Sequence, residues 1–315
     1  MMMHRNPTFE EDSYHARGDK TEKQVLFEQM DAILPWEELL EKMQPYYYKG
    51  KRGRPPFPLE VMLRVTFAQQ WLNRSDRKMK DTLKEKLTVR FFARLEPDQS
   101  PDASTICKFR GWLQKHNLGA VLLELSKKHL EAKGILTKMS TSVDSTIIDA
   151  PTSTKNEDQQ RDPEMKSTRK GKQWHFGMKA HIGTDANGYV HSAKVTVANV
   201  HDSTVMEECL HGEEEAIYGD KGYVSEERKQ KFESRGVRWR VLRKASRGKQ
   251  LTEEDKAFNR ECNRVRSFVE HPFGVVKHLW GHRKVRYRGL RKNAWHMYML
   301  FGLANFYRAR KQLAV

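Results

Sequence analysis

Three acidic residues stand in three unlike settings of this 315-residue sequence. Asp144 lies in the strand-like run MSTSVDSTIIDA, Asp220 follows the strand-like run AIYG, and Glu270 lies in the helix-like run NRVRSFVEHPFGVVK. Carboxylates carried by two strands and a helix can meet at one point, and their oxygens are the ligands that hard divalent cations prefer. The pattern therefore predicts a site that holds metal ions against a phosphodiester.

Two cations accompany the third acid. Arg266 lies four residues before Glu270 and Lys277 lies seven residues after it, so both project from nearly the same helix face. This spacing predicts phosphate-binding cations on either side of a metal ligand. Taken singly, each acid could instead bond its own backbone, begin a turn or form a surface ion pair. The combination with the basic end of the chain favours the catalytic interpretation.

Histidines offer a competing metal site. They recur at regular intervals, at His175, His181, His191, His201 and His211. No compact pair with a neighbouring cysteine or carboxylate appears at zinc-ligand spacing, so most are predicted to be packing or surface residues. His175 and His201 could still approach the three acids and orient a water or a substrate.

The charge of the chain is unevenly distributed, although its total is +17. Residues 1–135 hold 24 basic and 19 acidic side chains, residues 136–220 hold 9 and 14, and residues 221–315 hold 25 and 8. An acidic middle with a basic end predicts a polyanion as partner, because Lys and Arg contacts to phosphates supply sequence-independent affinity. A basic surface kept for solubility is the alternative, but it would not require a concentrated block.

Composition also bears on the compartment. The longest apolar stretch, near 295–307, is shorter than the roughly 20 residues that a membrane helix needs. The N-terminus is polar where a signal peptide is apolar. We therefore expect a cytoplasmic protein with no membrane partner. The three separated cysteines, Cys107, Cys209 and Cys262, support neither a disulfide framework nor a CxxC zinc site.

Length and pattern predict two domains. Residues 1–135 are expected to form a helical DNA-binding domain with a linker near 46–57, and residues 136–315 a catalytic domain. Ser75 is a predicted helix cap, and either Asp102 or Ser104 caps a later helix.

Two segments of the first domain are candidates for DNA contact. The predicted helix 105–113 carries Lys108 and Arg110 and is a candidate reader in a helix-turn-helix arrangement. A helical bundle without DNA contact is the alternative. Arg52 and Arg54 lie in an RGRP sequence that resembles the core of a minor-groove AT-hook, although an ordinary basic linker is favoured.

From about residue 138 the pattern becomes β-like. Strands are predicted in SVDSTIID, WHFGMKAHIGTD, GYVHSAKVTVANV, AIYG and GVRWRVLRK, with a hairpin turn at residues 185–188. Helices are predicted in HDSTVMEECLHG, in SEERKQKFESRG and over 252–279. This order predicts an α/β fold with a mixed sheet and helices on its faces.

Long motifs along the chain resemble those of a bacterial DDE transposase of the insertion-sequence-five group, within the insertion-sequence-four superfamily. They include GRPPFPLEVMLR near the front, GKQWHFGMKAHIGTD, ANVHDS and YGDKGY in the middle, and VEHPFGVVK with KVRYRGLRKN near the end. The resemblance implies a ribonuclease H-like catalytic core with basic C-terminal helices. It also implies a bacterial, nucleoid-associated protein.

The resemblance implies a residue assignment as well. The catalytic acids fall on Asp144, Asp220 and Glu270, which would hold two Mg²⁺ ions, with Mn²⁺ as a substitute. The superfamily signature of Tyr, Arg, Glu and Lys is matched except that Asn263 stands at the tyrosine position. The predicted DNA contacts are Arg266, Lys277, Lys221, Arg264, Arg52, Arg54, Lys108 and Arg110. The predicted auxiliary residues are His175, His201 and Asn263.

The activity implied is that of a DNA transposase. It would bind the terminal inverted repeats of its insertion sequence in double-stranded DNA, cleave phosphodiester bonds and join the 3′-hydroxyl ends to target DNA. A homodimer is expected in the DNA complex, because two element ends must be held together. The alternatives are a ribonuclease H-like nuclease without strand transfer and a catalytically inert DNA-binding regulator.

Overall fold

Helices occupy the described part of the first 135 residues, as predicted. The protein is represented by a computed structural model that describes residues 18–47, 55–96, 98–245 and 250–313. Arg52 and Arg54 of the predicted linker lie outside the described residues. The helices are α2 (Glu22–Ile33), α3 (Trp36–Met43), η1 (Gln44–Tyr46), α4 (Leu59–Trp71), α5 (Asp76–Glu85), α6 (Leu87–Ala93), α7 (Ala103–Lys115) and α8 (Leu118–Ala132).

Side-chain caps explain where two of these helices begin. The Ser75 hydroxyl accepts a hydrogen bond from the backbone N–H of Lys78 at 3.3 Å, at the start of α5. The Asp102 carboxylate accepts one from the backbone N–H of Thr105 at 2.6 Å, at the start of α7. Each bond satisfies an N–H that has no partner inside the helix. Of the two caps proposed for α7, Asp102 rather than Ser104 fills the position.

Four strands follow residue 139, and helices and two further strands come after them. The strands are β1 (Ser140–Asp149), β2 (Lys166–Lys170), β3 (Gln173–Thr184), β4 (Val190–Val197), β5 (Ala216–Gly219) and β6 (Arg238–Val241). The helical segments are α9 (Asp202–Val205), η2 (Met206–Cys209), η3 (Lys221–Tyr223), α10 (Glu226–Glu233), α11 (Glu253–Arg266), η4 (Ser267–Val269), α12 (Glu270–Phe273), η5 (Gly274–Leu279) and α13 (Leu290–Leu313).

The strand order is that of a ribonuclease H-like fold, as predicted. β1 pairs with β3 in the antiparallel sense and with β5 in the parallel sense. β3 also pairs with β4, and β5 pairs in parallel with β6, so the central order is β4-β3-β1-β5-β6. The predicted hairpin between β3 and β4 is present, and Gly188 has the positive φ of 78° that its turn needs.

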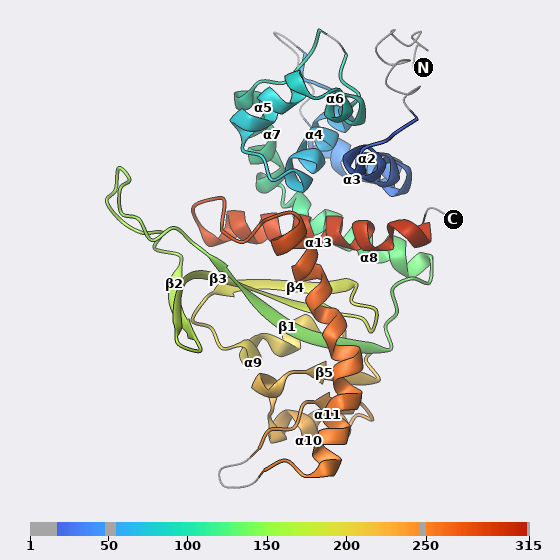
Figure 1. The fold of residues 1–315 in the computed structure, drawn as a ribbon, viewed down its shortest axis with the longest axis vertical. Coiled ribbons are helices and arrows are strands. Elements are labelled where there is room, and N and C mark those ends of the chain that lie inside the picture. Colours follow the sequence, from blue (N-terminus) through green and yellow to red (C-terminus); the bar gives the residue numbers. More distant parts are fainter. Residues whose placement is uncertain (1–17, 48–54, 97, 246–249, 314–315) are drawn as a thin grey trace.

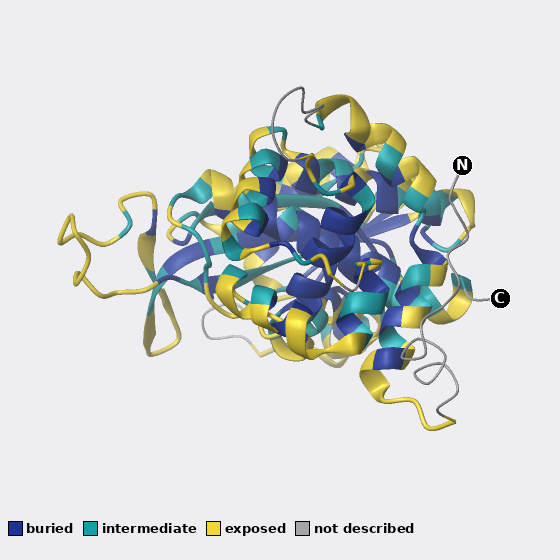
Figure 2. Cartoon of the chain, turned by 90° about the horizontal axis from the view of Figure 1, so that it is seen from above, coloured by how far each residue is buried: buried dark blue, intermediate teal, exposed yellow. Residues whose placement is uncertain are grey.

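Strand β2 was not predicted. It pairs with β3 but its five residues, KSTRK, are mostly exposed and carry no apolar alternation. A strand recognised only by its backbone pairing gives no period-two signal in the sequence. The connection from β1 to β2 and the turn from β2 to β3 are exposed and project from the body of the molecule (Figures 1 and 2).

Helices cover both faces of the sheet. The continuous helical run from α11 to η5 crosses one face, where Val269 and Val276 are buried in the same cluster as Ile148 of β1. The opposite face carries α9, η2 and α10, with Val143 of β1 and Ile217 of β5 in a second cluster.

The helix predicted over 252–279 is present, but its second half changes to 3₁₀ and π geometry. The helix predicted in HDSTVMEECLHG is shorter, because only α9 and η2 form.

Helix α13 joins the helical part to the sheet. It contacts α2 and α8 on the helical side and β4 on the sheet side (Figure 1). Apolar residues surround nearly its whole circumference, which explains the apolar stretch near 295–307. In the described parts of the chain, no helix is both long and apolar enough to cross a membrane.

Buried polar groups reinforce this junction. His282 and His296 donate from Nε2 to the backbone and side-chain oxygens of Gln70, at 2.9 and 2.8 Å. Burial lowers the pKa of His282 to about 4, so the imidazole is neutral near pH 7. A single apolar cluster also runs from α4 through α13 to β1. The division into domains of 1–135 and 136–315 stays a prediction.

Candidate active site

Two of the predicted catalytic acids lie level on neighbouring strands. β1 and β5 are parallel, with Ser142 opposite Tyr218. Continuing this register by two residues brings Asp220, just beyond the end of β5, level with Asp144 in β1. The Asp220 carboxylate accepts the backbone N–H of Gly222 at 2.8 Å, which holds it at the strand end. The register thus places the two acids side by side on the central strands of the sheet.

The third acid is connected to the first through an arginine. Arg266 Nη2 donates to Glu270 Oε1 at 2.9 Å, as the four-residue spacing predicts. Its Nη1 lies 3.9 Å from Asp144 Oδ2, a contact between α11 and β1. One guanidinium therefore faces carboxylates from a strand and from a helix. The side chain of Glu270 is 60% exposed, so it is accessible to a ligand.

The pKa of Asp144 depends on the charges of the other two acids. The pKa of Asp144 is raised to about 6, mainly by burial and to a smaller extent by the negative charges of Asp220 and Glu270. The backbone N–H of Ser145 and the guanidinium of Arg266 act in the opposite direction. A nearby buried phenol, Tyr223, has its pKa raised by burial and then by the charge of Asp144. Negative charge is thus concentrated around a partly buried carboxyl.

We expect Asp144→Asn to stabilise the metal-free protein in a pH-dependent way. The folded chain holds the Asp144 proton more tightly than the unfolded chain, whose carboxyl has a pKa near 4. Ionisation therefore destabilises the fold as the pH rises through this window, and the effect is complete above about pH 7. The variant should gain about 3 kcal/mol in unfolding free energy near pH 7.5 and about half of that near pH 5. Urea titrations at both pH values measure it, and equal gains would contradict the assignment.

The donor set fits hard divalent cations. Three carboxylates supply the oxygen ligands that Mg²⁺ and Mn²⁺ prefer, and a cation would offset the negative charge that raises the Asp144 pKa. Within the described ranges, no three acidic, histidine or cysteine side chains lie close enough together to share one ion. Arg266 instead makes the contact between Glu270 and Asp144. Coordination of a single ion by all three carboxylates would therefore require side chains at this site to reorient.

The other two signature positions support the same region. Lys277 donates from Nζ to Thr146 Oγ1 at 2.9 Å and to the carbonyl of Ile147 at 3.0 Å, which attaches the π-helical segment η5 to β1. Burial lowers the pKa of Lys277. Asn263, at the tyrosine position, accepts a hydrogen bond from Arg266 Nε at 3.3 Å. The sequence located both residues but not these contacts.

The two auxiliary histidines have other partners. His175 Nδ1 lies 2.9 Å from Asp149 Oδ1, near the end of β1. His201 accepts the backbone N–H of Ser203 and begins α9. Among the residues that the structure describes, neither histidine forms a hydrogen bond or an ion pair with the three acids.

The remaining predicted DNA contacts differ in accessibility. Lys108, Lys221 and Arg264 are exposed. Arg110 is only partly exposed, pairs with Asp76, and lies with its guanidinium carbon 5.1 Å from the centre of the Tyr287 ring. It therefore takes part in holding α7 against α5 and the segment before α13. Contact of any of these residues with DNA stays a prediction.

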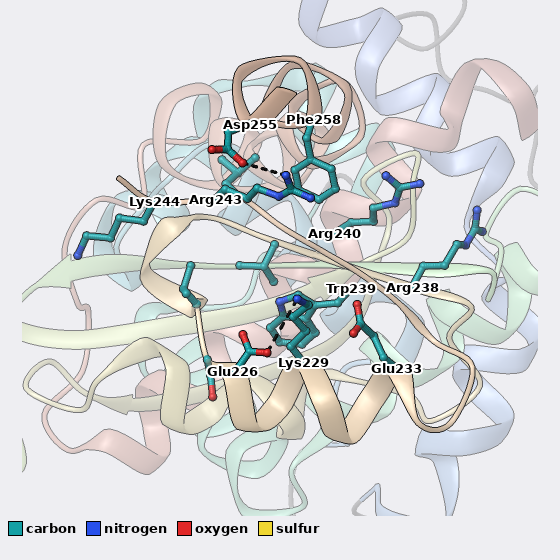
Figure 3. Close-up of a pocket in the computed structure, with 14 residues that line it drawn as sticks. Glu226, Lys229, Glu233, Arg238, Trp239, Arg240, Arg243, Lys244, Asp255 and Phe258 are labelled. Atoms are coloured by element: carbon teal, nitrogen blue, oxygen red, sulfur yellow. Dashed lines mark hydrogen bonds and ion pairs between the residues drawn. The ribbon is translucent and has the colours of Figure 1, made fainter. Parts of the chain in front are cut away.

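A pocket of about 590 Å³ lies beyond Asp220, between β6, α10 and α11 (Figure 3). Its wall begins at Val224, four residues after that acid. Four of its five basic residues have acidic partners, at 2.8 to 3.9 Å. The pairs are Arg243 with Asp255, Arg238 with Glu215, Arg240 with Glu261, and Lys229 with Glu226. Local neutralisation leaves this pocket little net attraction for a phosphate.

Comparison with known families agrees with the geometry of the three acids. Residues 137–306, more than half of the chain, match the family model described as "Transposase DDE domain". The chain belongs to the transposase DDE domain family. Residues 15–112 match a second model, "Transposase domain (DUF772)". DDE-domain membership indicates DNA transposase activity, which is phosphoryl transfer.

A solved structure that resembles this chain is the "piggyBac transposase synaptic complex with hairpin DNA". The two have 11% sequence identity and a TM-score of 0.41. The match covers 92% of this chain and 73% of that one. Membership of the insertion-sequence-five group stays a prediction.

Proposed function

We propose that this protein is the transposase of an insertion sequence. It would bind the terminal inverted repeats, cleave phosphodiester bonds at the element ends and join the freed 3′-hydroxyl groups to target DNA. The observation that supports this best is the placement of Asp144 level with Asp220, with Arg266 linking Asp144 to Glu270. A homodimer in the DNA complex would hold both ends at once.

The three acids would serve as the metal ligands. Two divalent ions held there would supply the charge that activates an attacking oxygen and stabilises the leaving 3′ oxygen. Asp144 must give up its proton to act as a ligand, because a protonated carboxyl is a poor donor to a cation. Arg266 would then be free to neutralise a phosphate next to the acids. Lys277 keeps η5, and with it the helix that carries Glu270, aligned on β1.

The test uses the DNA that flanks the gene. Labelled duplexes made from each flank are incubated with the protein, Mg²⁺ and a supercoiled target plasmid. We expect cuts at the element ends followed by transfer of the label to the plasmid. Binding and cutting without transfer would support the nuclease alternative, and binding with neither would support the inert regulator.

A further inference from the structure

A basic groove lies between the candidate reader helix and the start of α13. It has a volume of about 600 Å³ and is lined by Lys115 near the end of α7, by Arg288 just before α13, and by Arg291 and Lys292 in its first turn. One acid, Glu164, also lines it. The Glu164 carboxylate already accepts the backbone N–H of Leu290 at 2.7 Å, so it caps α13.

The charge of this groove is not neutralised locally. Arg288 pairs with Asp158 at 2.6 Å. Across the described ranges, however, no acidic side chain lies within ion-pair distance of Lys115, Arg291 or Lys292, and all three are exposed. The pocket of Figure 3 has a similar volume, but its cations are mostly paired. Three free cations around one concavity therefore favour a polyanion here and not there.

A short segment of chain connects the groove to β1, the strand that carries Asp144. Residues 281–289, which we call the connector, begin beside β1: Val285 N–H donates to the carbonyl of Asp149 at 2.9 Å. Arg283 Nε donates to the carbonyl of Lys277 at 3.2 Å. From Lys284 to Arg291 is seven residues, a span of at most about 25 Å. Lys284 pairs with Asp149, which lies five strand residues, about 17 Å, from Asp144. The path from the acids to the groove is therefore at most about 42 Å, little more than one turn of duplex DNA, about 34 Å.

The connector is also fixed at its far end. Arg286 Nη1 donates to the carbonyl of Arg74 at 2.9 Å, in the turn between α4 and α5. Tyr287 lies against Arg110 of α7. The groove therefore has a defined position relative to both α7 and β1, so one rigid ligand could span the two.

We propose that this groove binds the phosphate backbone of duplex DNA, between the part of the duplex contacted by α7 and the bond at the three acids. The proposal rests on the proposed function for the identity of the polyanion. It adds Lys115, Arg291 and Lys292 as phosphate contacts. It also places α7 and the active site along one continuous duplex.

The first test measures DNA affinity against salt concentration. The full chain, and a variant carrying Lys115→Gln, Arg291→Gln and Lys292→Gln, are titrated onto a fluorescent duplex of about 30 base pairs at about 50 to 200 mM salt. Each lost phosphate contact should reduce the slope of log affinity against log salt by about 0.9, so we expect a reduction of about 2.7. A matched variant with Lys229→Gln, Arg238→Gln and Arg243→Gln in the pocket of Figure 3 should show a clearly smaller reduction. Equal reductions, or no salt-dependent binding by the unaltered chain, would overturn the proposal.

A second test changes the charge at one position in both directions. Gly111 lines the groove on α7, and a Cβ built on it meets no atom within 4 Å. We expect Gly111→Lys to tighten binding of the same duplex and Gly111→Glu to weaken it, each by several fold. Changes of DNA affinity in the same direction for both variants would show a steric effect and would count against phosphate binding in the groove.

These outcomes are separate from those of the proposed function. A chain that binds DNA through the groove but never cuts or joins would leave the groove proposal standing. A chain that cuts and joins while both groove tests fail would retain the function and remove the groove.

Discussion

Asp144→Asn is expected to abolish DNA cleavage and joining while leaving DNA binding intact. The substitution keeps the size of the side chain but removes the charge at the position where all three acids interact. Loss of a metal ligand removes several kcal/mol of transition-state stabilisation, which corresponds to a rate about 10³-fold lower or more. Single-turnover cleavage of a labelled element end, with the protein in excess, measures this rate directly.

A matched control lies on the same strand. Asp149 ends β1, and its carboxylate contacts His175 rather than the other acids. We expect Asp149→Asn to keep more than about a tenth of the cleavage rate, since it changes no proposed metal ligand. Similar losses in both variants would mean that β1 is sensitive to any change of charge, and would remove the support for Asp144 as a ligand.

Gly119→Ala should strongly destabilise the protein. A Cβ built on Gly119 in α8 would overlap the carbonyl oxygen of Trp295 and come within 3.0 Å of the Trp295 ring. Both neighbours belong to Trp295 of α13, which is buried in the middle of that helix and cannot move away freely. Overpacking at such a contact should lower the free energy of unfolding by about 3 kcal/mol. Urea denaturation followed by far-ultraviolet circular dichroism measures the change.

The same substitution at another helix position serves as its control. Gly111 lies in α7 with open space around it, so Gly111→Ala introduces no contact. Alanine has the higher helix propensity, and we expect a gain of up to about 1 kcal/mol. If both variants lost stability, the close contact between Gly119 of α8 and Trp295 of α13 would not be the cause.

The sequence predicted the elements that have a local signal. The β3–β4 hairpin combines an alternating pattern with a turn that ends in Gly188, and both features are read from neighbouring residues. The caps Ser75 and Asp102 act within three residues of themselves. Strand β2 was missed because pairing with β3 is a long-range property that its KSTRK sequence does not encode in hydrophobicity.

The packing around α13 was also not predictable. A helix that is apolar on most sides has no amphipathic stripe, so its pattern does not say which elements surround it. The structure shows α8, α2 and β4 around it. The hydrogen bonds of Gln70 with two histidines more than 200 residues away likewise follow only from the tertiary arrangement.

The sequence by itself determined which acids are the catalytic candidates, because Asp144, Asp220 and Glu270 lie in short motifs, as do the cations beside Glu270. It also determined that the chain is basic at its end, since charge is a property of composition. Only the tertiary structure decided that Asp220 lies level with Asp144 and that Arg266 connects Asp144 to Glu270. It also decided that three of the groove cations have no acidic partner among the described residues. Each of these depends on distances between residues far apart in the chain, and such distances are set by strand register and helix packing rather than by local pattern.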